Sequence, residues 1–466
     1  MKSVIRDLHR QLTSGEYSCR ELVQEKITLL RDNTYHTTNQ LLEESALACA
    51  DRIDEKIKSG QSIAWLEGIP FGIKDTILLQ GSIASGGSAF LRNYTAPYTA
   101  TVIEKLMQAG AIPVVKENCD SFSHGVTNEN TVFGTVPNAH DNSRIAGGSS
   151  GGSAVNVAKG YTVFSVGTDS GGAIPAGYNR IYGLKPTFGR VSRYGVMAHV
   201  STADSIGPMA SSLEDIRIVL NAMSGKDAHD QLSSVSTPVP ESIFETKMQE
   251  TPITVGYYTS FLDNQYLDAT LKTAFQKMIA TLSDKGIRVI PLDFFDVDTL
   301  VSTWFTLAMA ETPSHLARFD GTVYGARSKN KNVQDGYLET RADKLSDETK
   351  RRITGGIQLT SHGYDEDVYL KARRLSNQIV HAIHDGFEKV NLILSPVAPA
   401  LPPMIGQSQD DPLSMYLQEA YCAGFNLGGY PVLTAPLFTP TGIQLTANKN
   451  REDLLLSLAH YLEEAQ

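Results

Sequence analysis

The sequence predicts a single large α/β domain, and three observations support this prediction. Between residues 66 and 210, short apolar runs rich in β-branched residues alternate with glycine-rich turns and with stretches of helical spacing, as in an α/β fold. The same alternation returns after residue 253, and no internal repeat divides the 466 residues. Residues 300–380 are charged and mostly helical in pattern. We therefore expect one domain, residues 1–466, with a helical elaboration in its C-terminal half.

The individual elements follow from the spacing of apolar residues. The N-terminal segment, residues 1–60, has apolar residues three or four positions apart with charges between them, which predicts helices that pack through one face. Residues 231–250 are rich in Ser, Pro and Thr, so we expect a surface connection there. The remaining expected elements, in chain order, are a helix at 102–109, strands at 112–115, 161–166 and 253–258, a helix at 267–285, and strands at 287–292, 390–394 and 432–436.

Composition indicates an ordinary folded protein and excludes several classes. Hydrophobic residues make up 41% of the chain and charged residues 20%, as in globular proteins. The net charge of −10 argues against a chain that binds nucleic acid through its overall electrostatic field. The four cysteines are scattered without a CxxC pair and no HExxH spacing occurs, so neither a disulfide framework nor a metal site is expected. No secretory-signal pattern or apolar run of about 18 residues is present, which predicts a cytoplasmic protein without a membrane segment.

A glycine- and serine-rich run at residues 147–154 leads into a helix-like stretch. Backbone N–H groups at the start of a helix can bind an anion or a developing oxyanion. A tight turn that needs glycine for its backbone conformation is the alternative interpretation. The run also contains the GxSxG pattern of the α/β-hydrolase nucleophile, but residues 141–144 predict a turn where that motif needs a strand. A phosphate-binding loop is excluded because no Gly-Lys-Ser/Thr closes the run.

Lys74 is the candidate base. It follows the apolar run 69–73, so its ammonium group is expected to be desolvated, and burial lowers the pKa of a lysine enough for it to accept a proton. Ser149 follows Lys74 by 75 positions, and position 173, at the end of a second glycine-rich motif, follows Ser149 by 24. Together with the segment Gly-Leu-Lys-Pro-Thr at 183–187, these motifs and intervals resemble the amidase signature family.

The resemblance implies a fold and a catalytic apparatus. The family fold is a central mixed β-sheet covered by helices, and its catalytic residues are a Lys, a bridging Ser and a nucleophilic Ser. By resemblance, neutral Lys74 takes a proton from the nucleophile through Ser149, which a cis peptide bond holds in place. The nucleophile position is Ala173 here. The resemblance assigns the oxyanion hole to backbone N–H groups of the same loop, those of Ser170, Gly171, Gly172 and Ala173.

The loop around Ala173 departs from the family pattern in two ways. Alanine has no oxygen, so no acyl-enzyme can form at this position. The family pattern also places an Arg and one further residue between this position and the Pro-Ala pair at 175–176, and both are missing. Ser170 lies three positions earlier, and the loop would have to shift to present its hydroxyl.

Five further segments narrow the resemblance to the A subunits of the aspartyl/glutamyl-tRNA amidotransferases. They lie at 189–195, 316–321, 350–353, 361–364 and 410–416. The likeness covers nearly the whole chain. It implies that the chain hydrolyses glutamine and passes ammonia to a B subunit, which uses ATP and Mg²⁺ to activate a misacylated tRNA, while a small C subunit completes a heterotrimer. No cofactor is expected in this chain itself.

The same resemblance implies a glutamine pocket. Matched motif by motif, Arg352 binds the α-carboxylate, Glu419 binds the α-ammonium, and Trp304 takes the place of a pocket tyrosine. The alternative is that Arg352 and Glu419 are solvated charges on helical faces. Two other functions stay open at this point: a stand-alone hydrolase of small amides, and a catalytically dead subunit that keeps only a binding or assembly role, for which Ala173 is the evidence.

Overall fold

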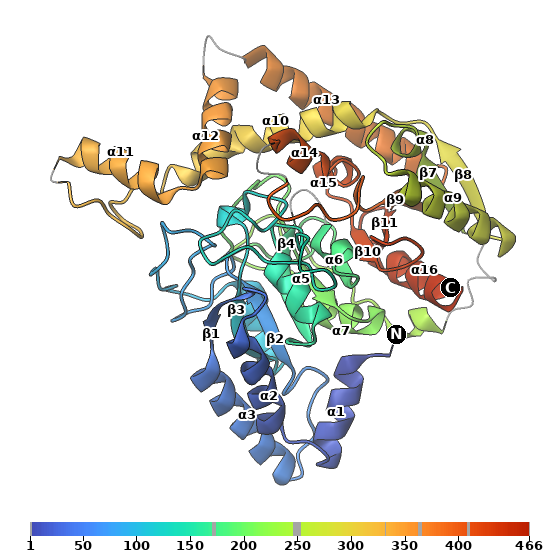
Figure 1. The fold of residues 1–466 in the computed structure, drawn as a ribbon. Helices are drawn as coiled ribbons and strands as arrows, with labels where there is room; N and C mark the ends of the chain where they lie inside the picture. Colours follow the sequence, from blue (N-terminus) through green and yellow to red (C-terminus); the bar gives the residue numbers. More distant parts are fainter. Residues whose placement is uncertain are drawn as a thin grey trace.

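The computed structural model describes residues 2–169, 174–245, 253–330, 332–361, 366–407 and 411–465. Its strands are β1 (Thr38–Leu41), β2 (Pro70–Lys74), β3 (Ile112–Glu117), β4 (Phe164–Asp169), β5 (Tyr182–Lys185), β6 (Ser205–Ala210), β7 (Thr254–Tyr258), β8 (Arg288–Leu292), β9 (Leu392–Pro396), β10 (Val432–Ala435) and β11 (Ile443–Ala447). They form an 11-stranded sheet in the order β1-β3-β2-β4-β6-β5-β10-β11-β9-β7-β8, with helices around it (Figure 1).

The sheet is mixed, as the family resemblance implies. β2 runs parallel to both β3 and β4, and β7 runs parallel to both β8 and β9. Between these two parallel groups, the strands from β4 through β6, β5, β10 and β11 to β9 pair antiparallel. β2 and β9 are buried along their whole length, because a central parallel strand is covered on both faces.

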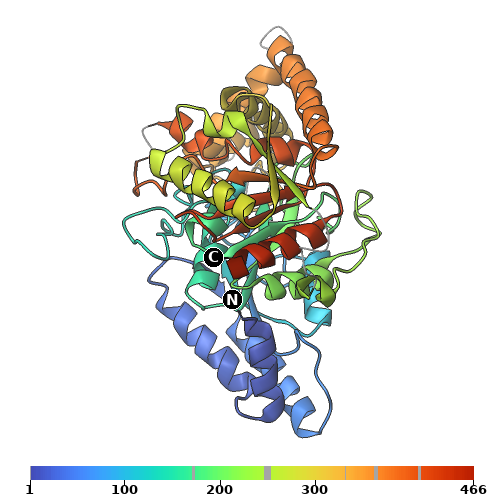
Figure 2. The same cartoon turned by 90° about the vertical axis from the view of Figure 1, so that its right-hand side faces the viewer.

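Helices cover the sheet and extend beyond it at both ends. They are α1 (Val4–Ser14), α2 (Cys19–Asp32), α3 (Glu43–Lys58), α4 (Thr101–Gln108), α5 (Gly151–Ala158), α6 (Ile174–Tyr178), α7 (Leu213–Met223), α8 (Thr259–Leu262), α9 (Ala269–Asp284), α10 (Val297–Leu316), α11 (Val333–Lys344), α12 (Asp347–Thr360), α13 (Glu366–Phe387), α14 (Pro412–Leu417), α15 (Ala423–Leu427) and α16 (Glu452–Ala465), with 3₁₀ turns η1 (Ser121–Ser123) and η2 (Glu241–Phe244). The helices α1–α3 lie at one end of the molecule and α11–α13 at the other (Figures 1 and 2). The helical elaboration expected in the C-terminal half is therefore confirmed as α10–α13. None of the described helices is long and apolar enough to cross a membrane.

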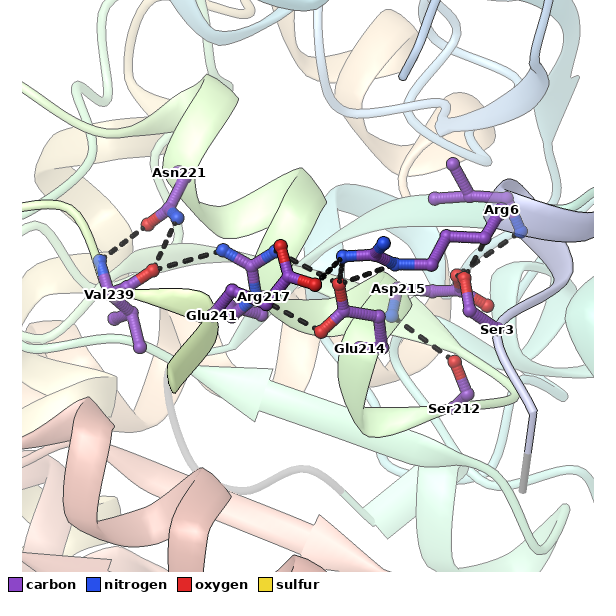
Figure 3. A network of polar contacts seen from close by, with 10 residues as sticks. Ser3, Arg6, Ser212, Glu214, Asp215, Arg217, Asn221, Val239 and Glu241 are labelled. Atoms are coloured by element: carbon purple, nitrogen blue, oxygen red, sulfur yellow. Dashed lines mark hydrogen bonds and ion pairs between the residues drawn. The ribbon is translucent and has the colours of Figure 1, made fainter. Parts of the chain in front are cut away.

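A polar network fixes the N-terminal helix α1 to α7 in the core (Figure 3). Ser3, the N-cap residue of α1, donates from Oγ to Oδ1 of Asp215 at 2.5 Å. Beside it, Glu214 accepts hydrogen bonds from Nη2 of Arg6 at 2.6 Å and from Nη2 of Arg217 at 2.9 Å. Because the buried carboxylate of Asp215 takes a donor from α1, that helix is an integral part of the domain.

Two expectations from the sequence need correction, and a third falls only partly within the described residues. The strand expected at 161–166 is β4, which lies three residues later at both ends, because the N–H of Tyr161 bonds to O of Asn156 at 2.8 Å and closes the end of α5. The N-terminal helical segment also contains β1, an edge strand whose pairing with β3 is a long-range contact that local spacing does not indicate. The connection expected at 231–250 is described only as far as residue 245, and it includes η2.

Candidate active site

The candidate base lies where two parallel strands end. Lys74 is the last residue of β2, and Thr168 lies near the end of β4. Ile73 pairs with Val166, so the side chains that follow meet at the same edge of the sheet, where α/β proteins commonly bind ligands. Nζ of Lys74 donates to Oγ1 of Thr168 at 2.6 Å and to Oγ of Ser149 at 2.7 Å.

Burial destabilises the charged form of Lys74. The side chain is fully buried. Burial lowers the pKa of the ammonium group, because a charge is poorly solvated in the interior. A neutral amine in contact with a hydroxyl can take the hydroxyl proton. Lys74 and Ser149 therefore form a pair that can transfer a proton.

Ser149 is positioned by the glycine-rich run just before α5. The peptide bond from Gly148 to Ser149 is cis, as the family resemblance implies. Gly147 has a φ of 81°, in the left-handed region that favours glycine. A Cβ on Gly148 would lie 2.0 Å from Oδ2 of Asp120, so only glycine fits there. The glycines make a tight turn, and α5 begins at Gly151 directly after it.

Asp120 fixes the loop that carries Ser149. Its backbone N–H donates to O of Ser149 at 3.1 Å. Its carboxylate accepts hydrogen bonds from the backbone N–H groups of Asn128 and Asn130, both at 3.0 Å. Burial raises the pKa of Asp120 to about 7, and the two N–H groups oppose the rise. The position of Ser149 therefore depends on a buried acid whose interactions are with backbone N–H groups.

A cavity opens beside the proton-transfer pair. Its described lining includes Ser149, Thr168, His199 and Glu419. Burial lowers the pKa of His199 well below its usual range, so the ring is neutral. The fold thus brings Ser149, from the glycine-rich run, and Glu419, which follows α14, to one space although they lie far apart in the sequence.

Glu419 is held by Trp304, a buried residue of α10. The indole Nε1 donates to Oε2 of Glu419 at 2.8 Å. Burial raises the pKa of Glu419 to about 7, while Arg352 and the indole hydrogen bond act in the opposite direction. Trp304 is not among the described residues that line the cavity, so in this structure it positions the carboxylate and does not form the cavity wall.

Arg352 is buried on α12 and is already ion-paired. Its Nε donates to Oε1 of Glu348 at 2.8 Å, and its Nη1 lies 3.3 Å from Nε2 of His199. Oε1 of Glu348 also accepts from the hydroxyl of Tyr416 at 3.0 Å. Nη2 of Arg352 has no hydrogen-bond partner among the described residues. With 2% of its surface exposed, Arg352 is not the solvated helical charge of the alternative interpretation.

The structure places only part of the predicted site. Ser149 and Glu419 line the cavity, and Lys74 lies behind Ser149, to which it donates a hydrogen bond. Arg352 reaches the cavity only through His199 among the described contacts. Ser170, Gly171, Gly172 and Ala173, the expected oxyanion hole and nucleophile position, lie outside the described residues, as do parts of the segments at 361–364 and 410–416. No group of metal-binding side chains of three or more occurs within the described ranges.

Sequence reasoning missed three residues of this region. Thr168 accepts the second hydrogen bond from Lys74. It belongs to the same glycine-rich motif as position 173, and this was the signal that could have identified it. Glu348 lies four residues before Arg352 on one helix, which is the usual spacing of a helical ion pair. His199 had no local signal, because a single histidine outside any motif is most often a structural residue.

A comparison with known families identifies the family of this chain. The model of the amidase family matches residues 21–456. The chain belongs to the amidase family. Among amidase-family relatives, the A subunit of a glutamyl-tRNA(Gln) amidotransferase from Cyanothece is 38% identical over 99% of this chain and 97% of its own length. One of the same name from Chlorobaculum tepidum is 35% identical over 98% of this chain and 97% of its own length.

Solved structures of other proteins share the fold. The A subunit of glutamyl-tRNA(Gln) amidotransferase from Thermotoga maritima aligns with a TM-score of 0.72 and 27% identity, covering 86% of this chain and 83% of that chain. A chain from a protein complex described as vestigial, which reveals the evolutionary origins of an s-triazine catabolic enzyme, aligns with a TM-score of 0.85 and 25% identity, covering 100% of this chain and 98% of that chain. The mixed sheet covered by helices is therefore the amidase fold.

Proposed function

We propose that this chain is the glutamine-hydrolysing A subunit of a tRNA-dependent amidotransferase. It supplies ammonia for the conversion of Glu-tRNA(Gln) to Gln-tRNA(Gln) or of Asp-tRNA(Asn) to Asn-tRNA(Asn). The observation that carries the proposal is the buried Lys74–Ser149 pair, which opens on the same cavity as the carboxylate of Glu419. Relatives that bear this subunit's name match the chain over nearly its full length, which supports the choice of substrate.

The proposed site recognises glutamine by its two charged groups. Glu419 neutralises the α-ammonium, and Arg352 offers to the α-carboxylate its Nη2, which has no hydrogen-bond partner in the described part of the chain. A guanidinium and a carboxylate form a strong charge-assisted pair. A simple aliphatic amide lacks both charges, so the site favours an amino-acid amide.

Partners complete the proposed enzyme. A B subunit holds ATP and Mg²⁺ and activates the misacylated tRNA, and a C subunit joins the two chains in a heterotrimer. No cofactor is assigned to this chain. The net charge of −10 fits a protein that meets tRNA through its partners. The proposed location is the cytoplasm, where aminoacyl-tRNA is used.

A second candidate is favoured by one specific observation. Position 173 is Ala, so the acyl-enzyme of the family pattern cannot form there. A chain that binds glutamine and assembles with its partners, but does not hydrolyse glutamine, agrees with that residue. The two candidates share the cavity and the partners and differ only in turnover.

The test is co-purification followed by two measurements on the assembled complex. The tagged chain is expected to retain B and C subunits co-expressed from the same source, and the complex to bind glutamine in calorimetry and to release ammonia from it. Butyramide is expected to bind no better than background. Hydrolysis of butyramide by the isolated chain, with no preference for glutamine, would establish the stand-alone hydrolase instead. Glutamine binding without ammonia release would establish the second candidate.

The raised pKa of Glu419 predicts a pH dependence of glutamine binding. An ammonium group pairs best with the ionised carboxylate, so affinity should rise as the pH increases through about 7 and fall below it. Trp304→Phe removes the hydrogen bond to Oε2, which raises the pKa further and moves this rise to higher pH. Calorimetry from about pH 6 to about pH 8.5, with Glu419→Gln as the control that should flatten the profile, checks the prediction. Identical profiles for the parent chain and Glu419→Gln would show that another group titrates.

A further inference from the structure

We infer that Ser149 is itself the nucleophile of this chain, with Lys74 as its base. The family pattern uses Ser149 only to relay a proton from a serine at position 173, and this chain has Ala there. With no hydroxyl at that position, the relay has no nucleophile to activate. The hydroxyl that Lys74 contacts directly is then the activated one. This inference rests on the proposed glutamine site and names the residue that performs the chemistry in it.

The described geometry suits a serine–lysine pair. Oγ of Ser149 lies 2.7 Å from Nζ of Lys74, within the reach required of a nucleophile and its base. Serine–lysine pairs are a known variant of the Ser-His-Asp arrangement, so a lysine can serve as the only base. Lys74 is fully buried, whereas Ser149 is only partly buried and lines the cavity. The base is thus shielded from water while the hydroxyl is open to a substrate.

The start of α5 adds an electrostatic contribution. The helix begins at Gly151, two residues after Ser149, and the side chain of Ser150 makes no capping hydrogen bond among the described residues. The positive end of the helix dipole favours negative charge that develops beside it. Negative charge that develops on the amide carbonyl oxygen as Ser149 attacks is therefore favoured by a helix within the described part of the chain.

Thr168 is the competing hydroxyl, because it also accepts a hydrogen bond from Lys74, at 2.6 Å. Its backbone is fixed within β4 by antiparallel pairing with Ile206 of β6. Its hydroxyl is on a branched carbon, so a methyl group crowds the approach to a carbonyl carbon. Ser149 is unbranched and lies in a loop. We therefore assign the attack to Ser149 and a supporting hydrogen bond to Thr168.

The reaction balances with groups that the site and water supply. Oγ of Ser149 attacks the amide carbonyl carbon while Nζ of Lys74 takes the hydroxyl proton. The C–N bond breaks, the leaving nitrogen takes that proton, and ammonia and a glutamyl ester on Ser149 result. Water then attacks the ester carbon and gives a proton to Lys74. The C–Oγ bond breaks, Oγ recovers the proton, and glutamate leaves.

The experiment maps the acylated residue in the assembled complex. The complex is mixed with glutamine, quenched in acid, and digested for tandem mass spectrometry; a parallel sample is treated with a small alkyl fluorophosphonate, which labels activated hydroxyls irreversibly. We expect the glutamyl group and the phosphonyl label on Ser149. Lys74→Met should slow labelling by about 100-fold or more. Ser153→Ala, a matched serine change on α5 outside the described cavity lining, should leave labelling at Ser149 unchanged.

The other outcomes are decisive. Label on Ser170 or Thr168, lost in Ser170→Ala or Thr168→Val, overturns the inference and names the true nucleophile. Glutamine binding with no adduct and no ammonia overturns it in favour of the chain that does not hydrolyse glutamine. Absence of glutamine binding is a different result, because it removes the proposed glutamine site itself. A label that survives Lys74→Met at full rate shows that Ser149 reacts without its proposed base.

Discussion

Lys74→Met should reduce ammonia release from glutamine by about 10³-fold or more. The proposed attack requires Lys74 as the base, because Nζ contacts the hydroxyls of both Ser149 and Thr168 at this cavity. Methionine fills a similar volume and brings no charge into the interior, so the fold should persist. The measurement is the glutaminase rate of the assembled complex, together with glutamine affinity from calorimetry. Binding is expected to stay, because the substitution leaves Glu419 and Arg352 untouched.

Lys74→Arg is the matched control that separates a base from a buried cation. Arginine keeps the charge and donates hydrogen bonds, yet it does not lose a proton in proteins. If Lys74 acts as a base, both variants are inactive; if it only supplies positive charge, Lys74→Arg retains activity and the assignment is wrong.

The pH profile of the parent enzyme adds an independent check. Because burial lowers the pKa of Lys74 from the usual 10.5, activity should rise with pH through the lowered value and be lost as the pH falls below it. The glutaminase rate must be measured together with glutamine affinity at each pH, since Glu419 titrates at a pH of about 7 and affects binding. A glutaminase rate at saturating glutamine that does not change with pH would contradict the role of Lys74.

The contact between Lys74 and Ser149 was predictable because local sequence motifs specify both residues. Lys74 follows an apolar run that forms β2, and Ser149 lies in a glycine-rich run that begins α5. Glycine is required there for steric reasons, because a Cβ on Gly148 would collide with Asp120. Such constraints act within a few residues, so they leave a pattern in the sequence. The spacing between the motifs then identifies the family.

Some strands were not predicted because they contain residues that are unfavourable in strands. β6 contains Gly207 and Pro208, which are unfavourable in a central strand, yet it pairs with both β4 and β5. A Cβ on Gly207 would lie 1.8 Å from O of Leu184, so close backbone approach requires glycine at that point. A rule based on local sequence recognises that glycine and proline are unfavourable in a strand. It cannot recognise why glycine is required here, because the reason is the backbone of a neighbouring strand.

The roles of the binding residues depended on long-range partners. Trp304 was expected in the pocket wall, but its indole donates to Glu419 from α10. Arg352 was expected to face a carboxylate ligand, and it also holds the carboxylate of Glu348. A motif alignment identifies a residue. It does not show which neighbouring side chain already forms a hydrogen bond or ion pair with that residue.

Arg352→Ala should weaken glutamine binding by about 100-fold or more, because the α-carboxylate loses its charged partner. The variant also removes one of the two ion pairs of the buried Glu348, which keeps its pair with Arg351. Breaking a buried ion pair in this way typically costs about 3–5 kcal/mol of stability. Lost binding in the single variant could therefore come from unfolding, so the free energy of unfolding must be measured beside the affinity.

The double variant Arg352→Ala/Glu348→Gln removes both charges. It should regain part of the stability that the single variant loses, since the buried carboxylate that lost its pair with Arg352 is removed as well. Glutamine binding should stay weak, because the ligand's carboxylate still lacks a cation. Glu348→Gln alone should keep or strengthen binding, because it frees Nε of Arg352 from a competing carboxylate.

Calorimetry of the assembled complex with glutamine and chemical denaturation of each variant provide the two readouts. Affinity in the double variant equal to that of the parent would make Arg352 a purely structural partner of Glu348. The cavity would then recognise its substrate through Glu419 alone, and cationic amides without an α-carboxylate should bind as well as glutamine. Selective loss of glutamine affinity with recovered stability is the result that assigns the carboxylate to Arg352.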